Sequence, residues 1–472
     1  MPNKRLGFLV LGTVLAGCSF APNYVKPALT TPVTGYTDMG PWTPASPNDA
    51  APRGDWWVIY HDPTLSGLEQ KIDTSNPSYA AALSRYDEAV QTANEAASAQ
   101  YPLVDLDGYA TQNRQSADRP LRNDLGPNNY GDNEIAGSFS YELDLWGRVR
   151  NLVAEGKAQS QASGADAAAI RLSLEAQLAD AYFNLRGTDA EIQLLTETGA
   201  DYLHALQLTQ TQHAGGIVSG LDVGQAQTQY DTAVAQLTDA VAQRALYQHE
   251  IASLIGVPAN AFVLAANPNL PLPPAVPVAA SSVLLQRRPD VAAAERRAAA
   301  ANAQIGVARA AFFPSISINA TGGYEAEGGG INLFNLSNSF WSLGPELALT
   351  VFDGGERRAA DRLAIDQFNE ASSNYKTVAL TAFQQVEDNL VLCNELAIEA
   401  GQQADAVRAA AHTQDLSMIL YQDGADTYLD VVTAQAALLD TQRTALSIGT
   451  RRLQASVNLI EALGGGWTAP AS

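Results

Sequence analysis

Three carboxylates lie close together in the chain, where one long helical segment gives way to the next. Asp423, Asp426 and Asp430 are three and four residues apart, a spacing that can place them on one helical face, and Tyr421 precedes them. In several copies such carboxylates would repel one another, which raises their apparent pKa values and attracts cations. The same residues could instead cap a helix start, where aspartate accepts hydrogen bonds from amides. Cation binding and capping both stay open.

Other residues lack the spacing of a catalytic or metal site. The sequence has neither a P-loop nor a Gly-x-Ser-x-Gly elbow, and the Asp-Leu-Asp-Gly run at 105–108 lacks the later acidic ligands of a calcium loop. The histidines have no metal-ligand spacing. They are His61, His204, His213, His249 and His412. We therefore expect no enzyme, no cofactor and no bound metal.

The first residues have the pattern of an export signal. Two basic residues precede an apolar run at 6–15, and Leu-Ala-Gly comes directly before Cys18. Ten or so apolar residues are too few to span a bilayer, which needs about 20. The motif resembles the bacterial lipobox, which implies removal of residues 1–17 and acylation of the Cys18 thiol; a signal peptide ending beside a cysteine by coincidence is the alternative. In lipoproteins generally, an aspartate directly after the cysteine favours retention in the inner membrane. This chain has Ser19 there, which favours sorting to the outer membrane.

The exported chain is strongly acidic. Without the two basic residues of the signal, 28 Lys and Arg become 26 against 50 Asp and Glu, a formal net charge of −24. Nucleic acid is an unsuitable partner for such a surface. The other cysteine, Cys393, stands in an apolar stretch and has no second thiol for an intramolecular disulfide.

Long helices are expected in two stretches without proline, 128–257 and 346–469, because proline breaks helix interiors. From 148 to 213, apolar residues keep the three- and four-residue spacing of a coiled coil, and a second segment runs from 354 to 422. At 1.5 Å per residue the first would be about 100 Å long, far more than the ~30 Å of a bilayer core. We expect these rods in the periplasm.

The rods belong to an internal repeat. The proline pairs 77/102 and 289/314 are both separated by 25 residues, and the second proline follows an aromatic residue each time. The rods also end alike: twelve residues from Gly216 align without gaps on twelve from Gly424, at an offset of 208, with six identities. Each copy therefore contains strand, strand, long helix, tip and returning helix.

The predicted strands alternate between polar and apolar residues. They are expected at 104–111, 138–145, 315–320 and 343–351, with loops at 114–134 and 326–341. Such strands suit an outer-membrane β-barrel, although a soluble sandwich has the same alternation. Four strands cannot close a barrel, and lipid does not tolerate open edges. Two chains would give eight strands around a filled interior and three would give twelve around a lumen. A trimer is then the smallest arrangement that conducts.

Several motifs resemble those of the TolC/NodT-type outer-membrane factors. They are Asp55-Trp56-Trp57, Arg287-Arg288-Pro289-Asp290, Phe352-Asp353-Gly354-Gly355 and the paired Gly-(x)4-Leu-Asp-Val tips. The resemblance covers about residues 18–465. It implies a mixed α and β membrane protein, a trimeric twelve-stranded β-barrel with four strands per chain, continued by a long α-helical coiled-coil periplasmic tunnel. It also implies passive conduction of drugs or other small molecules. The implied partners are a periplasmic adaptor, an inner-membrane efflux pump of the RND type and outer-membrane lipid.

The resemblance assigns roles to the tips. It implies that Tyr421 and Asp430 belong to the channel gate, with Asp423, Asp426 and, on the first tip, Asp222 beside them. Asp426 stands where the family has an arginine, so the family's charge network is not carried over whole. The implied adaptor contacts are Gly216, Ile217, Gly424 and Ala425.

The predicted domain order follows the repeat. It is signal peptide 1–17, N-terminal extended segment and equatorial region 18–75, first repeat 76–257, equatorial linker 258–282, second repeat 283–465 and C-terminal tail 466–472. The alternative is a non-conducting structural or adaptor lipoprotein built on coiled coils. Such a protein needs no amphipathic strand pairs, and the conductance of the reconstituted protein separates the two.

Overall fold

The computed structural model describes residues 19–29, 44–45, 54–116, 118, 127–274, 278–279, 288–327 and 331–465. The chain divides into two compact units, each discontinuous in sequence. Unit 1 draws on 1–28, 85–163 and 293–375, and unit 2 on 29–84, 164–292 and 376–472. The predicted signal peptide, Cys18 and the predicted tail 466–472 lie outside the described residues.

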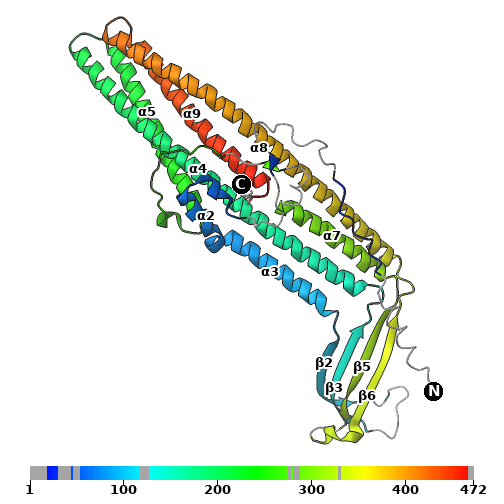
Figure 1. Ribbon diagram of the computed structural model, residues 1–472. Coiled ribbons are helices and arrows are strands. Elements are labelled where there is room, and N and C mark those ends of the chain that lie inside the picture. The colour runs from blue at the N-terminus through cyan, green and yellow to red at the C-terminus, as the bar shows by residue number, and fades with distance from the viewer. Residues whose placement is uncertain are drawn as a thin grey trace. The chain divides into compact units, whose positions relative to one another are not determined.

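Two helical hairpins of equal length repeat along the chain (Figure 1). Helices α4 (Arg148–Ala214) and α8 (Glu356–Gln422) each have 67 residues. Helices α5 (Gly220–Leu254) and α9 (Tyr428–Ala462) each have 35. Every boundary of the second hairpin is that of the first shifted by 208 residues. Both predicted rods and their offset are confirmed.

Shorter elements complete the described fold. The helices are η1 (Trp56–Tyr60), α2 (Pro63–Ser75), α3 (Pro77–Ser98), η2 (Ala259–Ala261), α7 (Pro289–Ala310), η3 (Ile331–Phe334) and η4 (Leu336–Asn338). The two-residue strands β1 (Pro44–Ala45) and β4 (Val278–Ala279) pair in parallel. Helices α3 and α7 begin at the repeated prolines, because the first helical position tolerates a missing amide hydrogen. None of the helices described is both long and apolar enough to cross a membrane.

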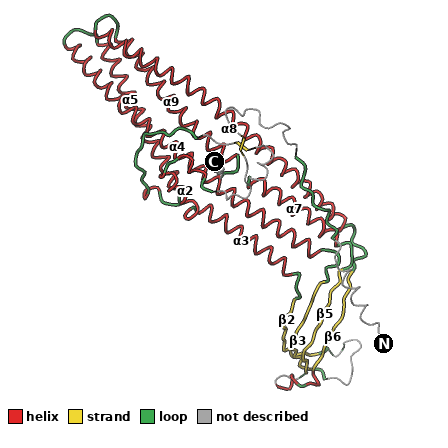
Figure 2. Tube along the Cα trace, viewed as in Figure 1, coloured by secondary structure: helices red, strands yellow, loops and turns green. Residues whose placement is uncertain are grey.

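Unit 1 contains an antiparallel four-stranded sheet in the order β2-β3-β5-β6 (Figure 2). Its strands are β2 (Leu103–Arg114), β3 (Asn129–Glu142), β5 (Ser315–Ala326) and β6 (Ser339–Ala348). Each repeat supplies one hairpin, and β3 joins β5 between them. Within the described parts of the chain, no strand pairs with the outer edge of β2 or of β6. The sheet is therefore open on both sides.

The predicted strand boundaries need correction. Residues 129–134, expected in a loop, belong to β3, because each is paired with a residue of β2. At the other end β3 stops at Glu142, so Leu143 and Leu145 lie beyond the strand. Asp144 turns the chain there: its carboxylate accepts hydrogen bonds from the first amides of α4, at 3.0 and 2.9 Å. The ends of β3 are therefore set by backbone pairing and by the Asp144 cap, and not by the alternation of apolar residues.

The core of unit 2 forms where η1 and α2 pack against the long helices. Trp57, Leu65 and Tyr182 are among its fully buried side chains. Asp62 begins α2, since its carboxylate accepts from the Thr64 amide at 2.8 Å, and the Tyr182 hydroxyl donates to its second oxygen at 2.5 Å. One aspartate thereby caps α2 and attaches it to α4.

Candidate constriction at the helical tips

Both hairpins reverse direction at a glycine. Gly216 has φ +74° and Gly424 has φ +71°, in the left-handed region that glycine adopts without strain. The Gly216 amide donates to His213 O at 2.9 Å and the next amide, of Ile217, to Gln212 O at 2.8 Å. The second tip repeats both bonds, at 3.0 and 2.8 Å. This pattern ends a helix by satisfying its last carbonyls. A Cβ at either glycine would meet nothing within 4 Å, so φ alone requires glycine.

Asp222 of the first tip is part of a helix cap. The Ser219 amide donates to its carboxylate at 2.8 Å, and the Asp222 amide donates to the Ser219 hydroxyl at 3.4 Å. This reciprocal capping box satisfies two amides at the start of α5. His213 lies 2.9 Å, through Nδ1, from the Val218 carbonyl and closes the turn. The first carboxylate is therefore already bonded within its own tip.

The second tip has more acidic residues than the first, and its N-cap residue, Thr427, makes no side-chain capping hydrogen bond. The Thr427 hydroxyl donates to Asp430 at 2.5 Å, and the Thr427 amide donates to Asp426 at 2.8 Å. Hydrogen bonding, chiefly from the Thr427 hydroxyl, holds the pKa of the Asp430 carboxyl below its ordinary value. In the single chain this direction is opposite to the rise expected from a ring of carboxylates. Asp430 and Asp423 are exposed.

The spacing of the three acids suggested one shared helical face, but the structure does not place them on one. Asp423 follows the end of α8 at Gln422, Asp426 precedes the start of α9, and only Asp430 is helical. The expectation was wrong because the chain reverses at Gly424 between them. The structure instead gathers these acids around one turn.

Tyr421 connects the two hairpins. Its hydroxyl donates to Gln212 Oε1 of α4 at 3.0 Å, and its ring lies 5.3 Å from that of Tyr428 on α9. Burial raises the pKa of Tyr421, so its hydroxyl keeps the donated proton. Beneath it, side chains of all four helices form a small apolar cluster that includes Leu206 and Val431. The Tyr421 hydrogen bond and this apolar contact thus join the two tips.

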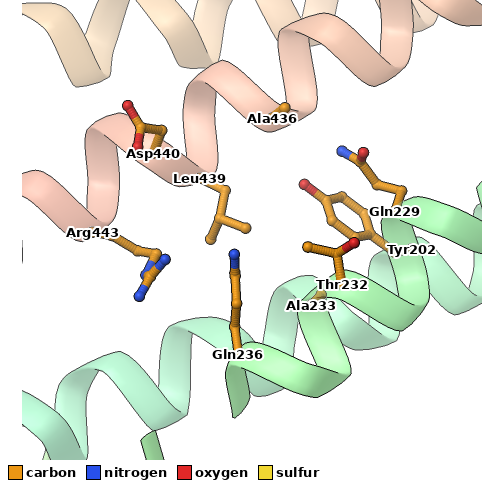
Figure 3. Close-up of a pocket in the computed structure, with 9 residues that line it drawn as sticks. All are labelled: Tyr202, Gln229, Thr232, Ala233, Gln236, Ala436, Leu439, Asp440 and Arg443. Carbon is orange, nitrogen blue, oxygen red and sulfur yellow. The ribbon is translucent and has the colours of Figure 1, made fainter. Parts of the chain in front are cut away.

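Further along the hairpins a cavity of about 230 Å³ opens between α4, α5 and α9 (Figure 3). Tyr202 and Gln236 line it from the first hairpin, and Leu439 points toward Gln236 from α9. Arg443 lines the same cavity and forms an ion pair of 2.6 Å with Glu191 of α4. Among the described residues, no group of three or more His, Cys, Asp or Glu side chains is arranged to hold a metal ion.

Known proteins share this architecture. Residues 68–257 and 280–465 match the family model described as outer membrane efflux protein. The chain belongs to the outer membrane efflux protein family. The probable efflux pump outer membrane protein TtgC of Pseudomonas putida is 30% identical over 477 residues, which cover 99% of this chain and 96% of that protein. The pyoverdine export protein OpmQ of Pseudomonas aeruginosa is 30% identical over 476 residues, covering 99% and 98%. The solved outer-membrane channel OprN matches with a TM-score of 0.87 at 26% identity, covering 95% of this chain and 100% of OprN.

In this outer membrane efflux protein, a motif that pointed to the family has a structural role. Arg288 is 8% exposed and forms an ion pair with Asp290 at 2.6 Å. It also donates to Gln385 of α8 at 2.7 Å and to the carbonyl of Ala462, the last residue of α9, at 3.1 Å. The Arg-Arg-Pro-Asp motif thereby attaches the start of α7 to both helices of the second hairpin.

Sequence reasoning missed three residues of the tips. Ser219 could have been found, because Ser-x-x-Asp before a helix is close to the capping-box pattern. Gln212 and Tyr428 gave no signal, since their contacts with Tyr421 join separate helices. These three residues, with those predicted, make up the candidate constriction.

Proposed function

We propose that three copies of this chain close a twelve-stranded barrel in the outer membrane and continue it as a helical periplasmic tunnel. The chain is the outer-membrane channel of an efflux system, and its substrates pass through passively. TtgC is named for an efflux pump and OpmQ for pyoverdine export, at the same identity to this chain. We accordingly propose a broad substrate class, drugs or other small molecules.

The open sheet is the observation that carries this proposal. Four strands leave the outer edges of β2 and β6 without strand partners among the described residues. Apolar side chains are exposed on both edge strands, with Leu106 at 78% and Leu343 at 67%. Lipid tolerates neither unpaired edges nor exposed backbone, so edges must pair between chains. Pairing β2 of one chain with β6 of the next closes twelve strands at a trimer, wide enough for a lumen.

The tips support the proposed partners. Ile217 is 75% exposed at the first tip and Leu429 is 53% exposed at the second. Exposed apolar residues beside turn glycines suit contact with helical hairpins of a periplasmic adaptor, through Gly216, Ile217, Gly424 and Ala425. The adaptor would connect the channel to an inner-membrane pump of the RND class. Tyr421, Asp423, Asp426, Asp430 and Asp222 are the proposed gate residues.

Cross-linking between edge strands tests the assembly. In a Cys393→Ser background, Leu106→Cys with Leu343→Cys should give covalent trimers with a short bismaleimide. The matched control is Ser138→Cys with Thr321→Cys, which are paired within one sheet and should cross-link inside the chain. The wild-type protein should also give conductance steps in planar bilayers. Monomers alone from the edge pair, together with silent bilayers, would favour the non-conducting lipoprotein.

A lipid anchor on Cys18 is the remaining part of the proposal. Its support is the Leu-Ala-Gly-Cys motif in the sequence. Cys18→Ser should abolish palmitate labelling and lipoprotein-type cleavage, while export persists because the barrel itself holds the trimer. Labelling that survives the substitution would show that the anchor lies elsewhere.

A further inference from the structure

A carboxyl group lies in the middle of the apolar face of α2. Leu65, Leu68 and Ile72 form that face and are at most 4% exposed, and Glu69 among them is 1% exposed. Neither carboxylate oxygen of Glu69 has a hydrogen-bond partner. Burying an ionised carboxylate without a partner is far more costly than burying a neutral carboxyl. The geometry therefore favours the protonated form.

The surrounding charges add to this preference. Glu175 on α4 accepts a hydrogen bond from the Trp56 indole at 2.9 Å and forms an ion pair with Arg171 at 2.9 Å. Arg171 also pairs with Asp73 of α2 at 2.7 Å. The cluster thus has one guanidinium for two carboxylates before Glu69 is counted. An ionised Glu69 would bring it to two excess negative charges.

The remaining titratable neighbours do not offset that excess. Tyr79 of α3 is influenced by Arg171, Asp73 and Glu175, and its own pKa is raised, chiefly by burial. Asp55, just before η1, adds another negative charge near Glu175. Burial, followed by repulsion from Glu175 and Asp73, raises the pKa of Glu69 well above its ordinary value. Burial likewise raises the pKa of Glu175 to about 7.

We propose that Glu69 binds a proton when α2 packs onto α4, so that the stability of this packing contact between the N-terminal segment and the channel helices depends on pH. The direction follows from linkage. A carboxyl whose pKa is higher when packed stabilises the packed state fully below its ordinary pKa, and that stability is lost as pH rises through the packed value. Acidic conditions therefore tighten the contact and alkaline conditions loosen it. This inference is independent of the proposed gate.

Hydrogen exchange of residues 63–75 in the full-length protein in detergent measures the stability of the α2–α4 contact directly. Between pH 6 and 9, after correction for intrinsic exchange, wild-type protection should fall by up to about tenfold per pH unit, the limit for one proton. Glu69→Gln should reduce this slope to the part that Glu175 contributes near pH 7, because the amide has the same shape and does not titrate. The control Glu88→Gln, at an exposed position of α3, should keep it.

Two results would overturn the proposal. One is wild-type protection that stays constant across this pH range. The other is the wild-type slope persisting in Glu69→Gln, which would place the proton on another group. If that variant does not fold, Glu69→Met, of similar length and apolar like its neighbours, should show the same reduced slope, and a slope as steep as in the wild type would be equally decisive.

Discussion

Between α4 and α5 the chain reverses with one carboxylate, whereas between α8 and α9 it reverses with three. The backbones match: both turns have a left-handed glycine, the same pair of closing hydrogen bonds and helices of equal length on either side. The side chains differ. Asp222 is bonded in a capping box, and Asp430, its equivalent, accepts from a threonine beside a second acid.

The difference separates two requirements of a hairpin tip. Reversal depends on a few backbone positions, which both copies keep. Charge depends on positions outside that framework, where the first tip has Gly215 and Val218 and the second has Asp423 and Asp426. Duplication therefore left one tip committed to helix capping and the other able to present charge.

The largest effect is expected from the shared backbone. A β-branched residue at φ +71° is strained by about 1–3 kcal/mol, so Gly424→Val should abolish most export while channel abundance is kept. Gly424→Asn, which tolerates this φ, is the matched control and should retain export. Drug accumulation and membrane immunoblots measure both. Equal loss in the two variants would mean that side-chain bulk at the tip, and not the turn, is the sensitive quantity.

A smaller effect should distinguish the tips by charge. Asp426→Ala with Asp430→Ala should lower the cation-to-anion permeability ratio severalfold and weaken block by trivalent cations. Asp222→Ala should lower both much less, because the Asp222 carboxylate is bonded in the capping box of α5. Reversal potentials in planar bilayers at low salt give the ratio. An unaltered ratio in the double variant would place the constriction elsewhere.

The pH dependence of that ratio sharpens the same test. Because the pKa of Asp430 is lowered from 3.8 by its hydrogen bonds, its charge should persist as pH falls to about 4. Thr427→Val removes the donated hydroxyl and should shift the loss of selectivity to higher pH. Selectivity that disappears above pH 5 in the wild type would show that repulsion within a ring of carboxylates prevails.

The bond between the hairpins should contribute a modest amount. Tyr421→Phe and Gln212→Ala each remove the 3.0 Å hydrogen bond, worth about 0.5–1.5 kcal/mol, and should raise resting conductance about two- to tenfold. The double variant should resemble the single ones, because only one interaction is lost. Additive increases would indicate that the two side chains act separately.

The smallest effect is expected at the first tip. Asp222→Ala removes one half of the capping box and should destabilise the start of α5 by about 1 kcal/mol. Faster hydrogen exchange at residues 219–224 would record it. Asp430→Ala, the equivalent substitution in α9, provides the comparison, because the Thr427 side chain makes no capping hydrogen bond there.

The long helices could be predicted because their cause is local. Proline is absent, apolar residues keep helical spacing, and the repeat transfers each boundary from one hairpin to the other. The strand boundaries were misplaced because backbone pairing continues wherever a neighbouring strand supplies donors and acceptors. The polar residues of β3 near Asn129 do not reveal from the sequence that such a neighbour is present.

The candidate site was predictable only in its backbone. Gly216 and Gly424 were recognised from their alignment, and their positive φ angles agree with it. The partner of Tyr421 was not, because Gln212 lies 209 residues earlier and reaches it only in the folded chain. Glu69 could have been noticed, since a carboxyl among Leu65, Leu68 and Ile72 interrupts an apolar face.

The two open edges of the sheet affect how the protein matures. If the proposed barrel forms, a lone chain cannot enter a bilayer while the outer edges of β2 and β6, which have no strand partner among the described residues, remain unpaired. Insertion must therefore accompany association, and its rate should depend steeply on the local concentration of newly exported chains. The same edges are templates for wrong pairing, so aggregation competes with assembly. Halving the synthesis rate should consequently lower the number of finished channels by more than half.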